Sequence, residues 1–319
     1  MRARGLDTQR QKAGVAALVL TTAIWSVPPL ILKQTALSPL DFAAYRLWAG
    51  VAIYAVIFAL TGRRLRWATM KACAPGGLLF AADVALSFTA FRLTRIADST
   101  IIGSLATVAI IVGAARWFGE RMERGDLWYV LAALIGVVFV AVGSSGRAGF
   151  SLAGDLYAVV GIFSWTGYWL FSKKARANAT ALEYMATVML VAAIVMTALV
   201  PLTGHALTPP RGSDWFRIWG VALFAGAVGH SLVAWSHQHV PAWMGALVLQ
   251  CQPAVSTGLA WVVLHESVGP LTGAGGALVV GATATLVMRA GRRDPDEFDE
   301  PEPTTPVALR RSAGASEPT

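Results

Sequence analysis

The sequence has little charge and little cysteine. Only 14% of its 319 residues are charged, whereas 55% are hydrophobic and the mean hydropathy is +0.57. Soluble domains carry about 25% charged residues, so this composition predicts a polytopic membrane protein. The two cysteines, Cys73 and Cys251, lack the spacing of a zinc site or a disulfide framework. Neither a metal nor a redox cofactor is therefore expected.

Motifs of the common enzyme classes are also missing. The sequence has no phosphate-binding loop of the form G-x-x-x-x-G-K-[ST], no H-E-x-x-H pair and no cluster of histidines and cysteines. His230 and Ser231 are adjacent, but neighbouring residues of a helix point in different directions, so they do not predict a hydrolytic pair. No catalytic residue is expected. An integral membrane enzyme or scaffold that acts on lipids is the alternative function.

Acidic residues are outnumbered, with 18 Asp and Glu against 26 Lys and Arg and a formal charge of +8. The bases stand in short loops between apolar runs and form no basic stripe with interleaved aromatics, so no nucleic-acid partner is expected. Seventeen bases fall in one set of alternate loops and six in the other. Because cytoplasmic loops retain positive charge, this bias predicts a multi-pass protein with both termini in the cytoplasm.

Ten apolar runs approach the length of about 20 residues that a helix needs to cross a bilayer. They lie near residues 14–33, 42–61, 72–91, 98–118, 126–143, 153–172, 182–202, 217–236, 242–264 and 270–289. The first run follows a basic cytoplasmic start, 1–13, and lacks a cleavage site, so it is expected to remain as a helix. Residues 291–319 are rich in Pro, Asp and Glu and predict a disordered cytoplasmic tail.

The two halves of the sequence repeat one another. Trp25 and Lys33 are eight residues apart, and Trp165 and Lys173 repeat that spacing 140 residues later. Further matches at similar offsets pair Asp83 with His230, Phe88 with Trp235, and Glu120 with Glu266. Because five spans per half is an odd number, the second half should enter the membrane upside down relative to the first. Inverted repeats of this kind build secondary carriers, with a site near the midplane where the halves meet.

The sequence resembles the EamA-domain group of the drug/metabolite transporter superfamily over residues 14–290. The likeness rests on Trp25, Lys33, Pro39 and Arg46, on GERMERGDLWYVLAALIGVVFV from Gly119, on Trp165 and Lys173, and on QCQPAVSTGLAWVVLHESV from Gln250, which includes Pro253 and Glu266. The sequence departs from the pattern at Thr107, where proline is usual, and at His265, where glycine is commoner.

The resemblance implies an all-α integral membrane protein of ten transmembrane helices, arranged as two inverted five-helix repeats, 14–143 and 153–290. It implies a secondary transporter that exports small organic solutes, such as amino acids, related metabolites or drugs, across the plasma membrane by alternating access. Its partners would be a small-molecule substrate and the lipid bilayer. No cofactor is expected, proton coupling and a homodimer are open alternatives, and the substrate is not specified.

Two titratable residues inside predicted spans are candidates for the substrate site, because charged side chains at mid-span are costly and normally face the bundle interior. Asp83 could bind a proton or a cationic group, or it could pair permanently with a base such as Arg46. His230 occupies the equivalent place in the second half. It could gate transport by protonation or hydrogen-bond a neighbouring helix.

Aromatic and amide side chains complete the candidate site. Trp25, Trp165 and Tyr168 could stack on an organic substrate, or they could pack between helices. Gln250 and Gln252 flank Cys251 just before Pro253, a proline that frees backbone carbonyls, and their amides could recognise a carboxylate or amide of a metabolite. Consecutive helix positions point about 100° apart, so at least one of the two could serve only to hold helices together.

Other polar and small residues predict structural roles. Anchoring of helices and pairing with loops are favoured for Arg46, Glu120 and Glu266, which lie nearer helix ends or in the motifs of the family. A series of small residues four apart, which lets helix backbones approach closely, comprises Gly273, Ala277 and Gly281. The series could pack within one chain or between two copies.

Overall fold

The computed structural model describes residues 2–33, 35–93, 96–120, 123–143, 151–204, 206–252, 254–255, 259 and 269–290, and no strand occurs among them. The helical elements are α1 (Arg2–Trp25), α2 (Pro28–Lys33), α3 (Pro39–Thr61), α4 (Trp67–Leu93), α5 (Ile96–Phe118), the 3-10 turn η1 (Arg124–Asp126), α6 (Leu127–Gly143), α7 (Leu152–Ala175), α8 (Ala181–Leu202), α9 (Asp214–Gly220), the π-helix η2 (Val221–Gly229), α10 (His230–Ser236), α11 (Ala242–Leu249) and α13 (Pro270–Ala290).

The helical fold class is confirmed for the described residues. Each of the ten predicted runs overlaps a described helix. Among the described residues, four helices are both long and apolar enough to cross a membrane, namely Pro39–Thr61, Trp67–Leu93, Ala181–Leu202 and the continuous Asp214–Ser236. The predicted tail, 291–319, lies outside the described residues, as do Pro253, His265 and Glu266. The crossing of ten helices stays a prediction.

Three of the predicted spans are interrupted in the described part of the chain. The run predicted as one helix at 14–33 ends as α1 at Trp25 and restarts as α2 at Pro28, because consecutive prolines cannot supply the backbone donors of a continuing helix. The helix that ends at Ser236 contains a nine-residue π segment, η2. Helix α11 ends at Leu249, just before the turn at Gln250 and Cys251. The interruptions leave backbone groups that side chains must satisfy.

Helix starts follow the expected capping chemistry. The Ser38 hydroxyl accepts a hydrogen bond of 3.1 Å from the Asp41 amide at the start of α3. Thr180 and Glu183 form a reciprocal capping box at the start of α8. Such caps satisfy amides that have no partner inside the helix, and so they fix where each helix begins.

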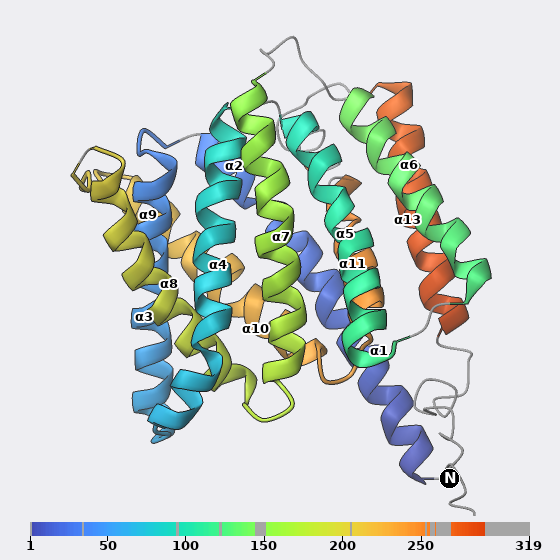
Figure 1. Ribbon diagram of the computed structural model, residues 1–319, viewed down its shortest axis with the longest axis horizontal. Helices are drawn as coiled ribbons and strands as arrows, with labels where there is room; N and C mark the ends of the chain where they lie inside the picture. Colours follow the sequence, from blue (N-terminus) through green and yellow to red (C-terminus); the bar gives the residue numbers. More distant parts are fainter. Residues whose placement is uncertain are drawn as a thin grey trace, which may run out of the picture.

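Helices from the two halves of the chain alternate in space. Helix α4 lies against α7 and α8, α3 lies against α8 and η2, α1 lies against α10 and α11, and α5 lies against α7 and α11 (Figure 1). Helices α6 and α13 pair at one edge of the bundle (Figure 1). The halves are therefore interleaved, and the core of the bundle is built from both.

The α6–α13 pair depends on glycine. A Cβ atom at Gly136 would lie 2.7 Å from the Gly275 carbonyl oxygen and 2.9 Å from the Val279 amide nitrogen. Only a residue without a side chain therefore lets the two backbones approach so closely. The predicted small-residue series lies elsewhere on α13: Gly273 and Gly281 are exposed, and nothing lies within 4 Å of a Cβ atom at either. It does not supply the described packing within this chain.

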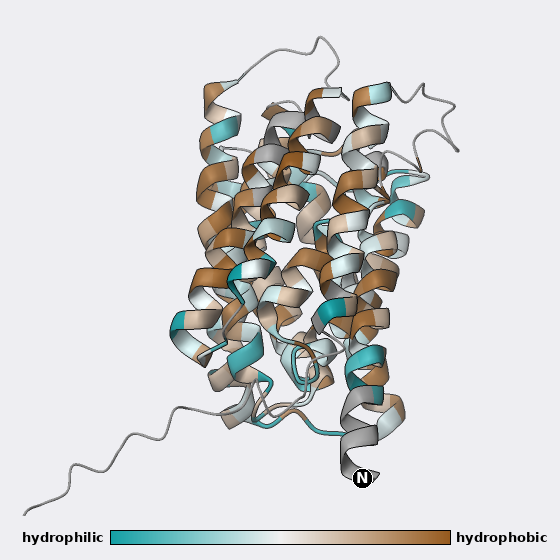
Figure 2. Cartoon of the chain, turned by 90° about the vertical axis from the view of Figure 1, so that its right-hand side faces the viewer, coloured by the Kyte–Doolittle hydropathy of each residue, from teal (hydrophilic) through white to brown (hydrophobic). Residues whose placement is uncertain are grey.

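Large apolar side chains cover much of the outer surface. Hydrophobic residues predominate along the helices in Figure 2. On the outside of α6 and of the α9–η2 helix, the large exposed apolar side chains are Leu127, Trp128, Leu131, Ile135, Val138, Phe139, Val142, Trp215, Phe216, Trp219, Leu223, Phe224 and Val228. Faces of this composition are suited to hydrocarbon rather than water, in agreement with a protein embedded in a bilayer.

Candidate functional site

An aromatic cluster lies where the first helix of each half meets the π-containing helix. The indole rings of Trp25 on α1 and Trp165 on α7 meet edge to face, with centroids 5.8 Å apart. The His230 ring lies 4.5 Å from the ring centroid of Trp25 and 4.6 Å from that of Phe80. Four helices thus converge on one group of rings. Edge-to-face and offset geometries are those that aromatic side chains favour.

Tyr168 extends the cluster toward α8. Its ring lies 5.6 Å from Trp165, 5.1 Å from Phe80 and 6.4 Å from Tyr184, measured between centroids. Its hydroxyl is 3.3 Å from Nδ1 of His230, at hydrogen-bond distance. Tyr168 is fully buried, and His230 is 6% exposed. The histidine therefore has a polar partner on the neighbouring helix as well as aromatic contacts.

The π-helix presents carbonyl groups to donors from the first half. The Trp25 indole Nε1 donates to the Ala225 carbonyl at 2.9 Å, and the Tyr54 hydroxyl donates to the Ala227 carbonyl at 3.1 Å. The Thr21 hydroxyl donates to the Gly229 carbonyl at 3.4 Å. A π segment displaces carbonyls from the α-helical pairing pattern, and such segments are frequent at functional sites.

Arg46 and Asp83 add opposite charges beside the rings. The guanidinium carbon of Arg46 lies 5.1 Å from the Phe88 centroid and 5.9 Å from the Phe80 centroid. Asp83 accepts a hydrogen bond of 3.2 Å from the Ser87 hydroxyl one turn along α4. The charges of Arg46 and Asp83 interact electrostatically, but these two described residues form no ion pair. The predicted permanent pairing is thus not a direct contact.

The two glutamines behave differently. Gln252 Nε2 donates to the Trp25 carbonyl at 2.9 Å, so this side chain bridges the break after α1. Both polar atoms of the Gln250 side chain are buried without a hydrogen-bond partner among the described residues. The Gln252 amide therefore has a partner on α1, whereas the Gln250 amide is unsatisfied among the described residues.

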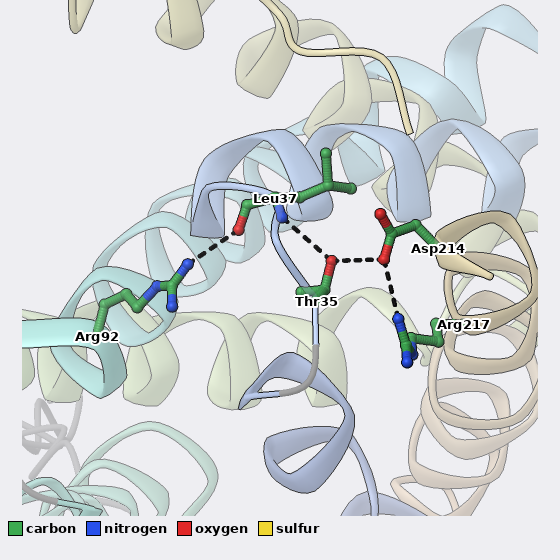
Figure 3. A network of polar contacts seen from close by, with 5 residues as sticks. All are labelled: Thr35, Leu37, Arg92, Asp214 and Arg217. Carbon is green, nitrogen blue, oxygen red and sulfur yellow. Dashed lines mark hydrogen bonds and ion pairs between the residues drawn. The ribbon is translucent and has the colours of Figure 1, made fainter. Parts of the chain in front are cut away.

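A polar network lies toward the upper end of the bundle in Figure 1. The Thr35 hydroxyl donates to Asp214 at 2.9 Å, and Arg217 reaches the same carboxylate oxygen at 3.1 Å. Leu37 donates its amide to Thr35, and its carbonyl accepts from Arg92 at 3.1 Å (Figure 3). The network joins the α2–α3 connection to α4 and α9, and hence the first half to the second.

A second network lies at the opposite end. Glu120, after α5, forms an ion pair with Lys173 near the end of α7 and accepts a hydrogen bond of 2.9 Å from the Ala242 amide at the start of α11. Lys173 also donates to the Val240 carbonyl at 3.4 Å. This arrangement agrees with the anchoring role predicted for Glu120. It again joins elements from both halves.

No metal centre is indicated in the described part of the chain. No group of three or more His, Cys, Asp or Glu residues there could hold a metal ion. The cluster offers aromatic faces, an imidazole, a carboxylate and a guanidinium. These groups suit binding of an organic solute by stacking and ionic contact rather than nucleophilic chemistry.

The structure gathers most of the predicted candidates. Trp25, Trp165, Tyr168 and His230 form a ring of contacts. Asp83 is one turn from Phe80, which contacts two of these residues, Tyr168 and His230. No hydrogen bond or ion pair joins Asp83 to His230, although both are described. Sequence reasoning missed Phe80 and placed Arg46 among structural anchors. The sequence does contain a signal for Arg46, because this base lies within a predicted span, four residues after its start at residue 42.

The chain matches known proteins along nearly all of its described length. A sequence model of the EamA-like transporter family matches residues 12–142 and, a second time, residues 152–288. The pseudopaline exporter CntI of Pseudomonas aeruginosa is 24% identical over 86% of this chain and 96% of its own. The uncharacterized transporter YwfM of Bacillus subtilis is 26% identical over 80% of this chain and 86% of its own.

A protein of known crystal structure has a similar fold. The TM-score is 0.72 at 22% sequence identity, and the match covers 91% of this chain and 100% of the other. At that identity the likeness concerns the course of the backbone.

Proposed function

The chain belongs to the EamA-like transporter family, and we propose that it is a secondary carrier that exports small organic solutes across the plasma membrane. Membership in this family and the names of the relatives, an exporter and a transporter, point to transport rather than to enzyme chemistry. The solutes would be amino acids, related metabolites or drugs. The site would comprise Trp25, Asp83, Trp165, Tyr168, His230, Gln250 and Gln252, with Phe80 and Arg46 added.

The observation that carries the proposal is the meeting of both family-matched segments at one cluster. Trp25 comes from the first segment, and Trp165 and His230 come from the second. Interrupted helices surround the cluster, as they do at the midplane sites of many secondary carriers. A solute bound there would touch both halves, so movement of one half against the other would change its access to each side.

Helix pairing supports an inverted repeat of two five-helix units. If α1, α3, α4, α5 and α6 correspond to α7, α8, α9–α10, α11 and α13, exchanging the halves converts the α4–α7 contact into the α1–α10 contact. The same exchange converts α5–α7 into α1–α11 and leaves α6–α13 unchanged. Such self-consistency is what a pseudo-twofold arrangement produces. The repeats would span 14–143 and 153–290, with both termini cytoplasmic and residues 291–319 a tail.

Alternating access would use the two polar networks as end closures. The network around Thr35 and Asp214 closes one end, and the Glu120–Lys173 network closes the other. Each joins the first half to the second, so each must break when its end opens. The two halves would rock about the aromatic cluster, which lies between the networks along α7 and α10.

Transport can be tested before the substrate is known. Purified protein would be reconstituted into liposomes loaded with a soluble bacterial metabolite extract, and the external solution would be analysed by mass spectrometry. We expect specific solutes to leave these liposomes unaltered and faster than they leave protein-free liposomes. If no solute leaves faster, or if a lipid is chemically altered instead, the proposal is wrong and the lipid-enzyme alternative gains support.

A further inference from the structure

Arg46 carries a buried guanidinium that donates no hydrogen bond to any described residue. Its side chain lies inside the bundle, and the residue is only 7% exposed. The Nε atom has no hydrogen-bond partner, and no described residue forms an ion pair with the guanidinium. An arginine carries five N–H donors and no acceptor, so this environment leaves its hydrogen-bonding capacity unused. Burial of a charge in this condition is costly within a membrane.

A second buried arginine among the described residues provides a comparison. Arg176 is 2% exposed, and although its Nη1 is unpartnered, its Nε donates to the Ala234 carbonyl at 2.8 Å and its Nη2 to Gln238 at 2.6 Å. The fold therefore does supply partners to a buried guanidinium where that group has a structural role. Arg46 instead faces the rings of Phe80 and Phe88. The N–H donors of Arg46 therefore lack an acceptor among the described residues.

Arg46 adjoins the aromatic cluster through Phe80. The Phe80 ring centroid lies 5.9 Å from the Arg46 guanidinium carbon and 4.6 Å from the His230 ring. Asp83, one turn along α4 from Phe80, interacts electrostatically with Arg46 but bonds to Ser87. The guanidinium thus has a nearby counter-charge without having its hydrogen-bonding positions filled.

We propose that Arg46 is the anion-binding residue of the transport site and that the substrates are organic carboxylates. The carboxylate would take two parallel hydrogen bonds from the guanidinium, a geometry for which arginine is suited. The apolar or aromatic body of the solute would lie on Trp25 and Trp165. Asp83 would neutralise Arg46 between transport cycles and lose that role when the substrate carboxylate arrives. The inference rests on the proposed transport function.

The test uses the liposome efflux experiment with a charge comparison. Among solutes that leave faster in the presence of protein, we expect organic carboxylates to predominate. Each exported carboxylate would then be loaded beside its primary amide, which has nearly the same shape and no negative charge. Efflux of the amide should be about ten- to hundredfold slower, the effect of losing a charge-assisted hydrogen bond.

Variants connect the selectivity to Arg46. Arg46→Gln should lose that ten- to hundredfold preference, and Arg46→Lys, which keeps the charge without the planar fork, should retain part of it. Arg289→Gln, which removes a base paired with Glu123 outside the cluster, should leave the preference unchanged. The carboxylate should also raise the thermal midpoint of the wild type in detergent and not that of Arg46→Gln. If Arg46→Gln does not fold, the Arg46→Lys variant and the comparison of acid with amide decide whether Arg46 binds the carboxylate.

The outcomes separate this inference from the proposed function. If no solute leaves the liposomes, the transport function fails. If solutes leave but acids and amides move at equal rates, or if Arg46→Gln exports the carboxylate within about twofold of the wild type, transport stands and the carboxylate inference is overturned.

Discussion

Trp25 and Trp165 lie at equivalent positions of the two family-matched segments, and their rings meet at 5.8 Å. Trp25 follows the start of the first match, residue 12, by 13 residues, and Trp165 follows the start of the second, residue 152, by the same number. The pair therefore lies where the two halves face one another. Perturbing its surroundings should affect transport more than stability.

Gly229 permits the close approach of Trp25. A Cβ atom at position 229 would lie 2.5 Å from the indole Nε1, which donates to the Ala225 carbonyl, whereas nothing lies within 4 Å of a Cβ atom at Gly220 in the same helix. We expect Gly229→Ala to displace the indole and slow efflux about tenfold or more, since misplacement by about 1 Å can cost that much. Gly220→Ala should transport normally. Equal efflux by the two variants would contradict the assigned contact.

Gly136 sets the separation of α6 and α13. Gly136→Ala would force its Cβ atom against the backbone at Gly275 and Val279, at an expected cost of about 1–3 kcal/mol in the free energy of unfolding. Gly273→Ala, in open space on the outer face of α13, should be neutral or slightly stabilising because alanine favours helix. Thermal midpoints from detergent chromatography would compare them. A lower midpoint for Gly273→Ala would instead indicate a contact of that face with a second copy.

Asp83→Asn removes a buried charge with little change in shape. We expect efflux to fall about tenfold or more while the protein still folds, because Arg46 loses its counter-charge. If Asp83 or His230 titrates during transport, efflux by the wild type should vary with pH, and efflux by the variant should vary less. Efflux measured between pH 5 and 8 in matched liposomes would show this. Normal efflux with an unchanged pH profile would make Asp83 a spectator.

Topology can be checked independently of transport. The charge bias and the even number of predicted spans place both termini in the cytoplasm. Alkaline phosphatase fused after Arg293 should be inactive, because the enzyme acquires its disulfides only outside the cytoplasm. A fusion in the 203–213 loop, between α8 and α9, should be active. The reverse pattern would invert the proposed orientation.

Much of the helical architecture was predictable from the sequence, because apolar runs separated by short polar segments mark helices directly. The break after Trp25 follows from Pro28 and Pro29. The π-helix was not predictable, since Val221–Gly229 contains no proline and its carbonyl partners, Trp25, Tyr54 and Thr21, lie far away in the chain. Its conformation depends on tertiary hydrogen bonds.

Candidate site residues could be selected from the sequence where a titratable side chain lies inside a predicted span, as for Asp83 and His230. The sequence predicts an anchoring role for Arg46, a base near the start of a span, and does not indicate its place beside the aromatic cluster. Its surroundings come from a different helix, α4, through Phe80 and Phe88. The different roles of Gln250 and Gln252 likewise depend on which amide reaches Trp25, a distinction that spacing alone does not make.

The most direct test of the account is efflux from liposomes by Trp25→Ala and Trp48→Ala. Trp48 is 41% exposed on the outside of α3 and hydrogen-bonds Thr197, so its removal takes a tryptophan from the bundle surface. Trp25 contacts Trp165 and His230 in the cluster. We predict that both variants purify as folded protein, that Trp48→Ala exports solutes at a rate near that of the wild type, and that Trp25→Ala does not. Export by Trp25→Ala at the wild-type rate would contradict a transport site between the two halves.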